Sequence, residues 1–253
     1  MNLLETRELT KRFGGLTAVD GLALVVAAGE VRGLIGPNGS GKSTVINLVT
    51  GVLRPTTGRV WFRGEDVTAR ATDALFRRGV ARTFQTPRVV PGLTAVENVL
   101  VARARLAPLE LFRALTRGRG RRRDEGEHQA AGELLNLVNL GARADTPAEA
   151  LPHGQKRLLE IARALAGDPA LLLLDEPVAG MNATEAARVM TVIRTITARG
   201  TAVVLVEHNM RVVMAVADRV TVLDFGRVIA EGAPAEVRDH PAVLEAYLGP
   251  SHA

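Results

Sequence analysis

Residues 36–43 read Gly-Pro-Asn-Gly-Ser-Gly-Lys-Ser, which is the pattern Gly, any four residues, Gly-Lys-Ser. Glycine lets the chain turn so tightly that successive backbone N–H groups face one point, which suits phosphate oxygens. In such a loop Lys42 can reach the outer phosphates of a nucleotide, and the Ser43 hydroxyl can ligate Mg²⁺. The alternative is a glycine-rich turn that merely precedes a helix. The motif predicts a nucleoside triphosphate site, and kinases, GTPases, recombinases and transport ATPases all remain possible.

Two neighbouring acids, Asp175 and Glu176, follow a run of four leucines at residues 171–174. A continuous apolar run suits a strand that is buried on both faces of a parallel sheet. The end of that strand would bring Asp175 to the edge of the sheet beside the phosphate loop, where its carboxylate could hold Mg²⁺ through water. Glu176 would then be the general base for the water that attacks the γ-phosphate. Two solvated acids at a strand end are the alternative.

The elements that position these residues follow from the spacing of apolar side chains. Short apolar runs predict strands near residues 3–9, 22–26, 31–35, 59–62, 170–174 and 201–206, and a hairpin over 220–230 that turns at 224–226. Helical spacing predicts helices at 45–49, 95–106, 129–140, 155–166, 184–198 and 210–217. The Arg/Gly-rich stretch 116–125 lacks an apolar period and is predicted to be a loop. Together these elements predict an α/β sheet core with a mostly helical insertion.

The composition is that of an ordinary globular protein, with 47% hydrophobic and 23% charged residues among 253. No apolar run approaches the roughly 18 to 20 residues that span a bilayer, and the first residues show no signal-peptide pattern. Because there is also no cysteine for a disulfide framework, the chain is expected in the cytoplasm. The net charge of +5 comes from 32 basic and 27 acidic residues, and only 3% of residues are aromatic, so no nucleic-acid partner is expected.

Residues 151–165 read Leu-Pro-His-Gly-Gln followed by a helical pattern, and they resemble the Leu-Ser-x-Gly-Gln signature of ATP-binding cassette (ABC) ATPases. The phosphate loop, Gln85, the acids at 175–176 and His208 stand in the order and at the spacing of that family. The resemblance implies a P-loop NTPase fold with a RecA-like, mostly parallel sheet core, an N-terminal antiparallel β part and an inserted helical subdomain. It implies one nucleotide-binding domain over 1–253, with the core and β part at 1–85 and 166–253 and the helical subdomain at 86–165.

The resemblance also implies a role for each matching residue. ATP would be bound by the phosphate loop of one copy and the signature of another, through Phe13, Gly36, Asn38, Gly39, Ser40, Gly41, Lys42, Ser43, Thr44, Gly154 and Gln155. Mg²⁺ would be bound by Ser43, Gln85 and Asp175. The catalytic residues would be Glu176, Gln85 and His208, with His208 contacting the γ-phosphate. Phe13 would stack on the adenine, and the alternative for it is a phenylalanine of the core.

Two residues depart from the family pattern. Pro152 replaces the signature serine, which removes a hydroxyl and an N–H that could face the γ-phosphate of the opposite site, although proline suits the start of a helix. Asn182 replaces the usual aspartate near the dimer interface, and it keeps an acceptor oxygen but loses the charge. Both changes leave the strength of the contacts between two copies open, and hydrolysis is still expected.

Segments 13–19, 176–182, 207–210 and 246–249 resemble the ATPase subunits of branched-chain amino acid importers. The subunits that serve urea or amide import and lipopolysaccharide export share much of this pattern and are the alternatives. Outside transport, a soluble ABC ATPase of DNA repair or translation would carry long coiled coils or two cassettes. A small-molecule kinase would lack the signature and His208.

The resemblance implies partners as well. We expect a second ATPase subunit, identical or different, that pairs head to tail with the first. We also expect transmembrane permease subunits and, indirectly, a periplasmic or extracytoplasmic substrate-binding protein. The chain would lie on the inner face of the cell membrane as a peripheral protein. The basic run at 116–123 is either a solvated loop or a contact with the permease or with anionic lipid headgroups.

Overall fold

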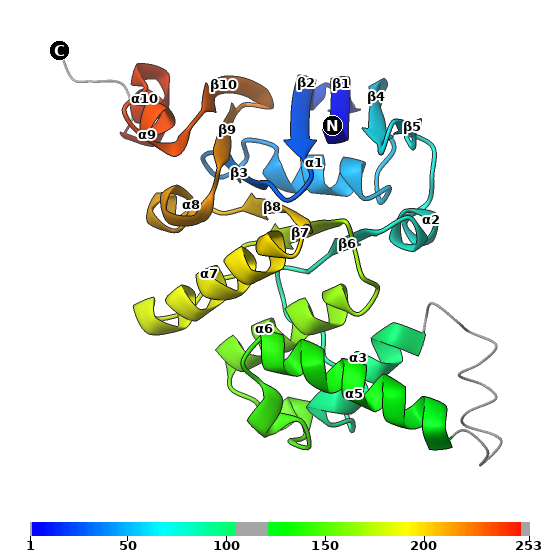
Figure 1. The fold of residues 1–253 in the computed structure, drawn as a ribbon. Coiled ribbons are helices and arrows are strands. Elements are labelled where there is room, and N and C mark those ends of the chain that lie inside the picture. The colour runs from blue at the N-terminus through cyan, green and yellow to red at the C-terminus, as the bar shows by residue number, and fades with distance from the viewer. Residues whose placement is uncertain (1, 105–120, 249–253) are drawn as a thin grey trace.

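The computed structural model describes residues 2–104 and 121–248, except for the side chains of 104, 121–124 and 248. Within these residues, six strands form a central sheet in the order β10-β9-β3-β8-β7-β6 (Figure 1). Its hairpin strand β10 (Arg227–Gly232) is antiparallel to its neighbour β9. The other strands are parallel, namely β3 (Val31–Ile35), β6 (Val80–Arg82), β7 (Leu171–Asp175), β8 (Ala202–Val206) and β9 (Arg219–Asp224). The strands predicted at 31–35, 170–174 and 201–206 and the hairpin are therefore confirmed.

The side chains of this sheet alternate between two hydrophobic clusters, one on each face. On β7, Leu171 and Leu173 belong to the cluster above the sheet in Figure 1, and Leu172 and Leu174 belong to the cluster below it. All four side chains are at most 1% exposed. Burial on both faces explains why this strand carries leucine at every position before its terminal acid.

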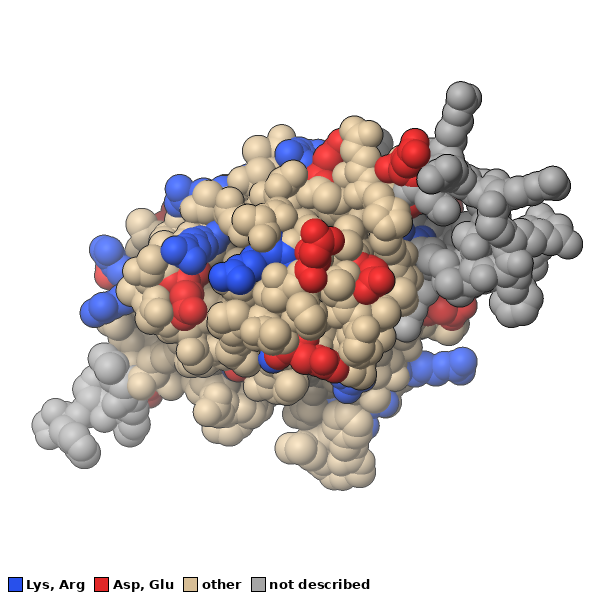
Figure 2. Space-filling model, turned by 90° about the horizontal axis from the view of Figure 1, so that it is seen from below, with Lys and Arg blue, Asp and Glu red and all other residues tan. Residues whose placement is uncertain are grey.

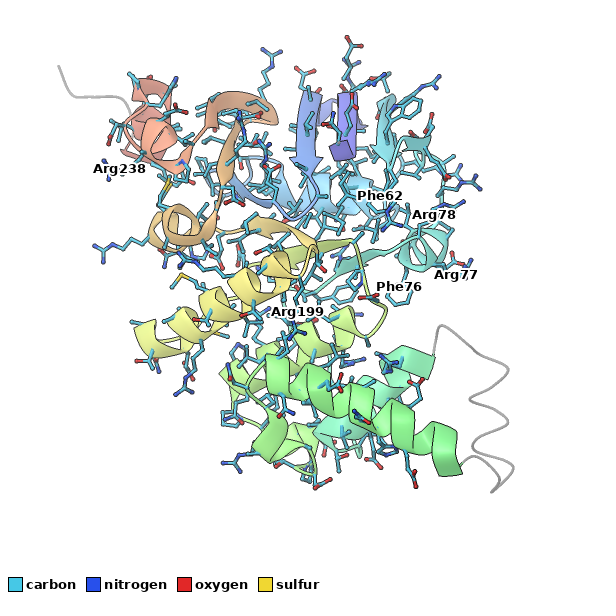
Figure 3. All side chains as sticks on the ribbon, in the orientation of Figure 1. Phe62, Phe76, Arg77, Arg78, Arg199 and Arg238 are labelled. Atoms are coloured by element: carbon cyan, nitrogen blue, oxygen red, sulfur yellow. The ribbon has the colours of Figure 1, made fainter. Side chains whose placement is uncertain are left out.

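Above the sheet lie helix α1 (Lys42–Val49) and a four-stranded antiparallel sheet in the order β2-β1-β4-β5 (Figure 1). The strands of this second sheet are β1 (Asn2–Phe13), β2 (Leu16–Ala27), β4 (Thr57–Phe62) and β5 (Glu65–Asp66). Phe62 points from β4 into the upper cluster, where it joins Val45 and Ile46 of α1 (Figure 3). The expected N-terminal antiparallel part thus covers the helix that follows the phosphate loop.

Below the sheet lie helices that share the lower cluster with it (Figure 1). They are α3 (Ala95–Ala104), α5 (Arg121–Leu137), α6 (His153–Leu165), α7 (Ala183–Ala198) and α8 (Met210–Val216). Two short 3-10 turns, Gly141–Arg143 and Ala148–Ala150, connect α5 to α6. The predicted helical insertion is therefore present. Across the described residues, no helix has both the length and the apolar character needed to cross a bilayer.

Short elements that the sequence did not predict complete the fold. Besides β5 and β6, they are α2 (Thr72–Arg77), α9 (Pro234–Arg238) and α10 (Pro241–Leu248). From α2, Phe76 points into the protein and its ring would lie 3.0 Å from a Cβ at Gly167, whereas Arg77 and Arg78 lie at the outer rim (Figure 3). Helices α9 and α10 lie beside β10 (Figure 1).

The basic stretch differs from its prediction. Helix α5 begins at Arg121, so the loop predicted over 116–125 is wrong from residue 121 onward, and residues 116–120 lie outside the described residues. Arginine and glutamate favour helices even without an apolar period, which explains the early start. On the lower face, basic and acidic side chains of the described residues lie next to one another (Figure 2). The charge on this face is therefore mixed.

Candidate functional site

The phosphate loop joins β3 to α1, as its sequence predicts. Gly41 precedes the helix with a φ of +103°, and a Cβ there would lie 2.3 Å from the carbonyl oxygen of Ala18, so only glycine fits. Gly39 has a φ of +81°, and a Cβ there would meet no atom of the described residues within 4 Å. The loop therefore borders open space at the start of α1, where backbone N–H groups and the helix dipole favour an anion.

Lys42 is held inside this loop. Its side-chain Nζ donates to the carbonyl oxygens of Gly36 and Pro37, both at 2.8 Å, and to the Ser40 hydroxyl at 3.3 Å. The residue is 7% exposed. Burial lowers the pKa of Lys42, and the negative charges of Glu176 and Asp175 oppose that shift. The predicted lysine and the two predicted acids therefore act on one another across the site.

The other predicted residues of the loop divide by exposure. Gly36 and Ser40 are buried, and the Ser40 carbonyl accepts a hydrogen bond of 3.0 Å from the backbone N–H of Gly226 in the β9–β10 turn. Asn38 and Ser43 are exposed, and Thr44 is half-buried. The β9–β10 turn thus stabilises the phosphate loop through Ser40. Ser43 is exposed in the first turn of α1, on the accessible side of the loop.

Asp175 ends β7 and is buried. Its backbone N–H faces the Thr83 hydroxyl at 3.4 Å, and the residue is 9% exposed. Burial raises the pKa of Asp175, and the adjacent Glu176 raises it further, while Arg82, Arg157 and Lys42 oppose the rise. The carboxylate therefore lies in an environment where more positive charge would be favourable.

Glu176 brings the three predicted catalytic residues together. Gln85 donates from Nε2 to its Oε2 at 3.2 Å, and His208 Nδ1 lies 3.5 Å from its Oε1. The backbone of Glu176 has a φ of +48°, an unusual conformation for a residue other than glycine, and its N–H donates to the Val206 carbonyl of β8 at 2.9 Å. A strained turn after β7 thus directs the carboxylate between two separate loops.

The signature residues Gly154 and Gln155 lie in the first turn of α6. Pro152 is the N-cap residue, with a φ of −55°, and no side chain caps α6 there, so the helix forms without the hydroxyl that serine would supply. A Cβ at Gly154 would lie 3.1 Å from the Glu185 carboxylate of α7. Helix α6 lies on the opposite side of the sheet from α1 (Figure 1), so the structure does not join the signature to the phosphate loop of the same chain.

Asn182 caps the helix α7. Its side-chain oxygen accepts the backbone N–H of Glu185 at 3.0 Å, and the Glu185 carboxylate accepts the backbone N–H of Asn182 at 3.1 Å. The acceptor oxygen that asparagine shares with aspartate is therefore used within its own chain.

Phe13 ends β1 with 46% of its surface exposed, so the core alternative for this residue is wrong. The ammonium of Lys11 lies 5.1 Å from the centre of its ring. Its role against adenine stays a prediction.

Glu207 is a residue of the site that the sequence analysis did not single out. It is fully buried between β8 and His208, and its Oε1 accepts the backbone N–H of Val178 at 3.2 Å. Burial raises the pKa of Glu207, and the backbone hydrogen bonds from Val178 and Asn209 oppose the rise. It thus ties the segment after Glu176 to the loop that carries His208. An acid directly after the apolar run 201–206 is the signal that could have found it.

The fold and the site define a class of protein. A glycine-rich loop between a buried parallel strand and a helix, with two acids at the end of a nearby strand, is the arrangement of a P-loop nucleoside triphosphatase.

Comparison with known proteins defines the family. Residues 19–179, more than half of the chain, match the family model described as ABC transporter, and residues 227–249 match that of a branched-chain amino acid ATP-binding cassette transporter. The chain is 41% identical to the high-affinity branched-chain amino acid transport ATP-binding protein BraF of Pseudomonas aeruginosa, and 38% identical to LivG of Escherichia coli, over 98% of each chain. The ADP conformation of MJ1267, an ATP-binding cassette of an ABC transporter, superimposes with a TM-score of 0.86 at 34% identity, over 99% of this chain and 100% of that one. This protein belongs to the ABC transporter family, and it is an ATP-hydrolysing cassette.

Proposed function

We propose that this chain is the ATP-hydrolysing subunit of a branched-chain amino acid importer. The observation that carries the proposal is the match of residues 227–249 to the branched-chain amino acid cassettes, because this segment lies outside the general ABC match. The similarity to BraF along nearly the whole chain supports it. The chain would act from the inner face of the membrane on separate permease subunits, which a periplasmic or extracytoplasmic binding protein supplies with substrate.

The phosphate loop would hold the phosphates of ATP. Lys42 now binds two backbone carbonyls and one hydroxyl, and an anionic phosphate is a stronger partner for an ammonium than these neutral groups. The open space beside Gly39 leaves room for the phosphates, with Asn38 and Thr44 at its edges. The exposed ring of Phe13 would stack on the adenine.

Mg²⁺ fits the donors that the site offers. The Ser43 hydroxyl, the Asp175 carboxylate and the Gln85 amide supply the oxygen ligands that this ion prefers. Two adjacent acids and the raised pKa of Asp175 support a cation at this point, because it would relieve their repulsion. When bound, Mg²⁺ would neutralise the charge that develops on the phosphoryl oxygens during transfer.

Glu176 would take the proton of the attacking water. Its two carboxylate oxygens each have a neighbour, Gln85 on one and His208 on the other, which fixes the plane of the carboxylate. A general base that is oriented in this way needs no rearrangement at the moment of proton transfer. His208 is exposed, so its ring can also reach a γ-phosphate beside Glu176.

The site would be completed by a second ATPase subunit. Because α6 lies across the sheet from the phosphate loop, Gly154 and Gln155 would contact the nucleotide of the partner in a head-to-tail pair. In this pair the helical segment 86–165 of one copy would face the phosphate loop in the other copy's core, which residues 1–85 and 166–253 form. Pro152 offers no hydroxyl to the opposite site, so the backbone of α6 would supply the contact.

Uptake of labelled substrate tests the proposal. A strain that lacks this chain should lose high-affinity leucine uptake, and the intact chain should restore it. Lys42→Ala should restore no uptake, and the purified variant should show no Mg-ATPase activity. Normal leucine uptake in the deleted strain, with loss of urea or amide uptake or a lipopolysaccharide defect, would overturn the assigned substrate. Equal ATP turnover by Lys42→Ala would overturn the site.

A further inference from the structure

The segment that carries Gln85 runs between α1 and α6. On the side of α1, the Arg82 guanidinium donates to the Asn47 side-chain oxygen at 2.8 Å and to the Thr50 hydroxyl at 3.3 Å. The Phe84 ring lies between two guanidiniums, 4.7 Å from that of Arg82 and 4.6 Å from that of Arg88. The residue before Gln85 is therefore fixed to the helix that follows the phosphate loop.

Helix α6 binds the same residue from the other side. The Glu160 Oε1 accepts the backbone N–H of Phe84 at 2.9 Å, and the Arg157 Nη1 donates to the Phe84 carbonyl at 3.0 Å. These two side chains are three positions apart on α6, so they project from the same face. A third residue on that face, Arg163, donates to the Arg88 carbonyl. Both peptide groups of Phe84 are thus held by one helix.

These contacts use charged groups in a buried place. Glu160 is 5% exposed and Arg157 is 4% exposed. Burial raises the pKa of Glu160 and lowers the pKa of Arg157, so each charge opposes folding unless its contacts offset the loss of water. Apolar side chains of similar volume would fill the space without the free-energy cost of removing charges from water. We therefore assign the two charged groups to binding the Phe84 backbone, not to packing.

We call Glu160 and Arg157, which bind the Phe84 backbone, the clamp. The helix that carries the clamp begins with the signature. Gly154 and Gln155 lie in its first turn, and Arg157 begins the next turn. Gln85 is the next residue after Phe84, so the contacts of α6 with Phe84 also fix the place of Gln85 beside Glu176.

We propose that Glu160 and Arg157 are positioning residues that hold the Gln85 amide beside Glu176. The proposal rests on the proposed function, because it assigns these residues to ATP hydrolysis. Neither side chain would need to touch the nucleotide. Both act through the backbone of Phe84.

Glu160→Met removes the acceptor for the Phe84 N–H and keeps a side chain of similar volume. We expect kcat for Mg-ATP to fall about ten- to hundred-fold, because a small displacement of a catalytic group has effects of this size. The dissociation constant for ATP should stay unchanged, since the phosphate loop is intact. Glu160→Gln keeps an acceptor oxygen and should recover most of the rate. Glu149→Ala is the matched control. It also removes a carboxylate that accepts a backbone N–H, that of Gly92 at 3.0 Å, but this contact does not involve the segment that carries Gln85.

A double-mutant cycle separates positioning from general destabilisation. If Glu160 acts through Gln85, then Glu160→Met should change kcat less than about two-fold in a Gln85→Ala background. Multiplicative losses in the double variant would overturn the proposal, as would full activity of Glu160→Met. Should Glu160→Met fail to fold, Arg157→Met in the same cycle decides the question from the other end of the clamp. If the parent and Glu149→Ala both lack ATPase activity, the proposed function fails instead.

Discussion

At the scale of single residues, Asp175 shows how the site opposes folding. Its carboxylate is buried next to a second acid, and the nearby cations only partly compensate. Because the pKa of Asp175 is higher in the folded chain than in the unfolded chain, the folded state holds the proton more tightly. Stability therefore falls as the pH rises from about 4, the value for a free aspartate, through the raised pKa of the folded state.

Asp175→Asn should accordingly stabilise the protein while abolishing Mg-ATPase activity. The melting temperature at pH 7 should rise by about 2 to 4 °C for each kcal/mol of relief in a chain of this size. Because asparagine does not titrate, the gain over the parent should vanish below about pH 4, where Asp175 is neutral. Thermal melts across this pH range check the expectation. A variant that melts below the parent at pH 7 would show that the neighbouring cations need this charge.

The residues of the site were predictable in type and order, but their contacts were not. Lys42, Asp175 and His208 stand in motifs, and each motif implies its own chemistry. The meeting of Gln85 with Glu176 joins positions 91 residues apart, and no local pattern encodes such a contact. Glu207 follows an apolar run that could have marked it, but its contact with Val178 of another loop has no local pattern either.

At the scale of elements, Asn182 departs from the family pattern, yet it still forms the N-terminal cap of α7. Asn182 uses its side-chain oxygen for the helix, which aspartate would do equally well. Asn182→Ala should therefore cost about 1 kcal/mol of unfolding free energy. Asn182→Asp should cost nothing, since a negative charge also suits the start of a helix.

Chemical denaturation of these two variants provides the measurement. Arg188→Ala is a control on the same helix, because Arg188 is exposed and alanine is an equally good helix former. It should change the unfolding free energy by less than about 0.5 kcal/mol. An unchanged midpoint for Asn182→Ala would mean that the capping contact adds nothing to stability.

Long periodic elements were predicted from the sequence, and short ones were not. Helix α7 was predicted within one residue because it buries a regular apolar face. The strand β3 is short, but it was predicted with its exact bounds because the glycine-rich phosphate loop follows it directly. The strand β6 has only three residues and α9 only five, too few for a period to emerge. Helix α5 starts in a basic run whose helical preference has no apolar signal to mark it.

At the scale of the whole molecule, the separation of α6 from α1 is the basis of the proposed head-to-tail pairing of two copies. Glu176→Gln should bind ATP without hydrolysing it, and so it should accumulate as a dimer. Light scattering should then show a doubling from the chain mass of 26.9 kDa on addition of Mg-ATP. Adding Lys42→Ala to the same chain should keep it monomeric. Hydrolysis by Glu176→Gln at the parent rate would show that Glu176 is not the base.

The leucines of β7 have a consequence for how the protein melts. Leu172 and Leu173 are neighbours in sequence but belong to different clusters, so both clusters pack against the same strand. If one cluster loses its packing, the strand that supports the other cluster becomes exposed. Local opening of one half is therefore costly, and the two cores should lose order together. Differential scanning calorimetry should record a single heat-absorption peak whose van't Hoff and calorimetric enthalpies agree.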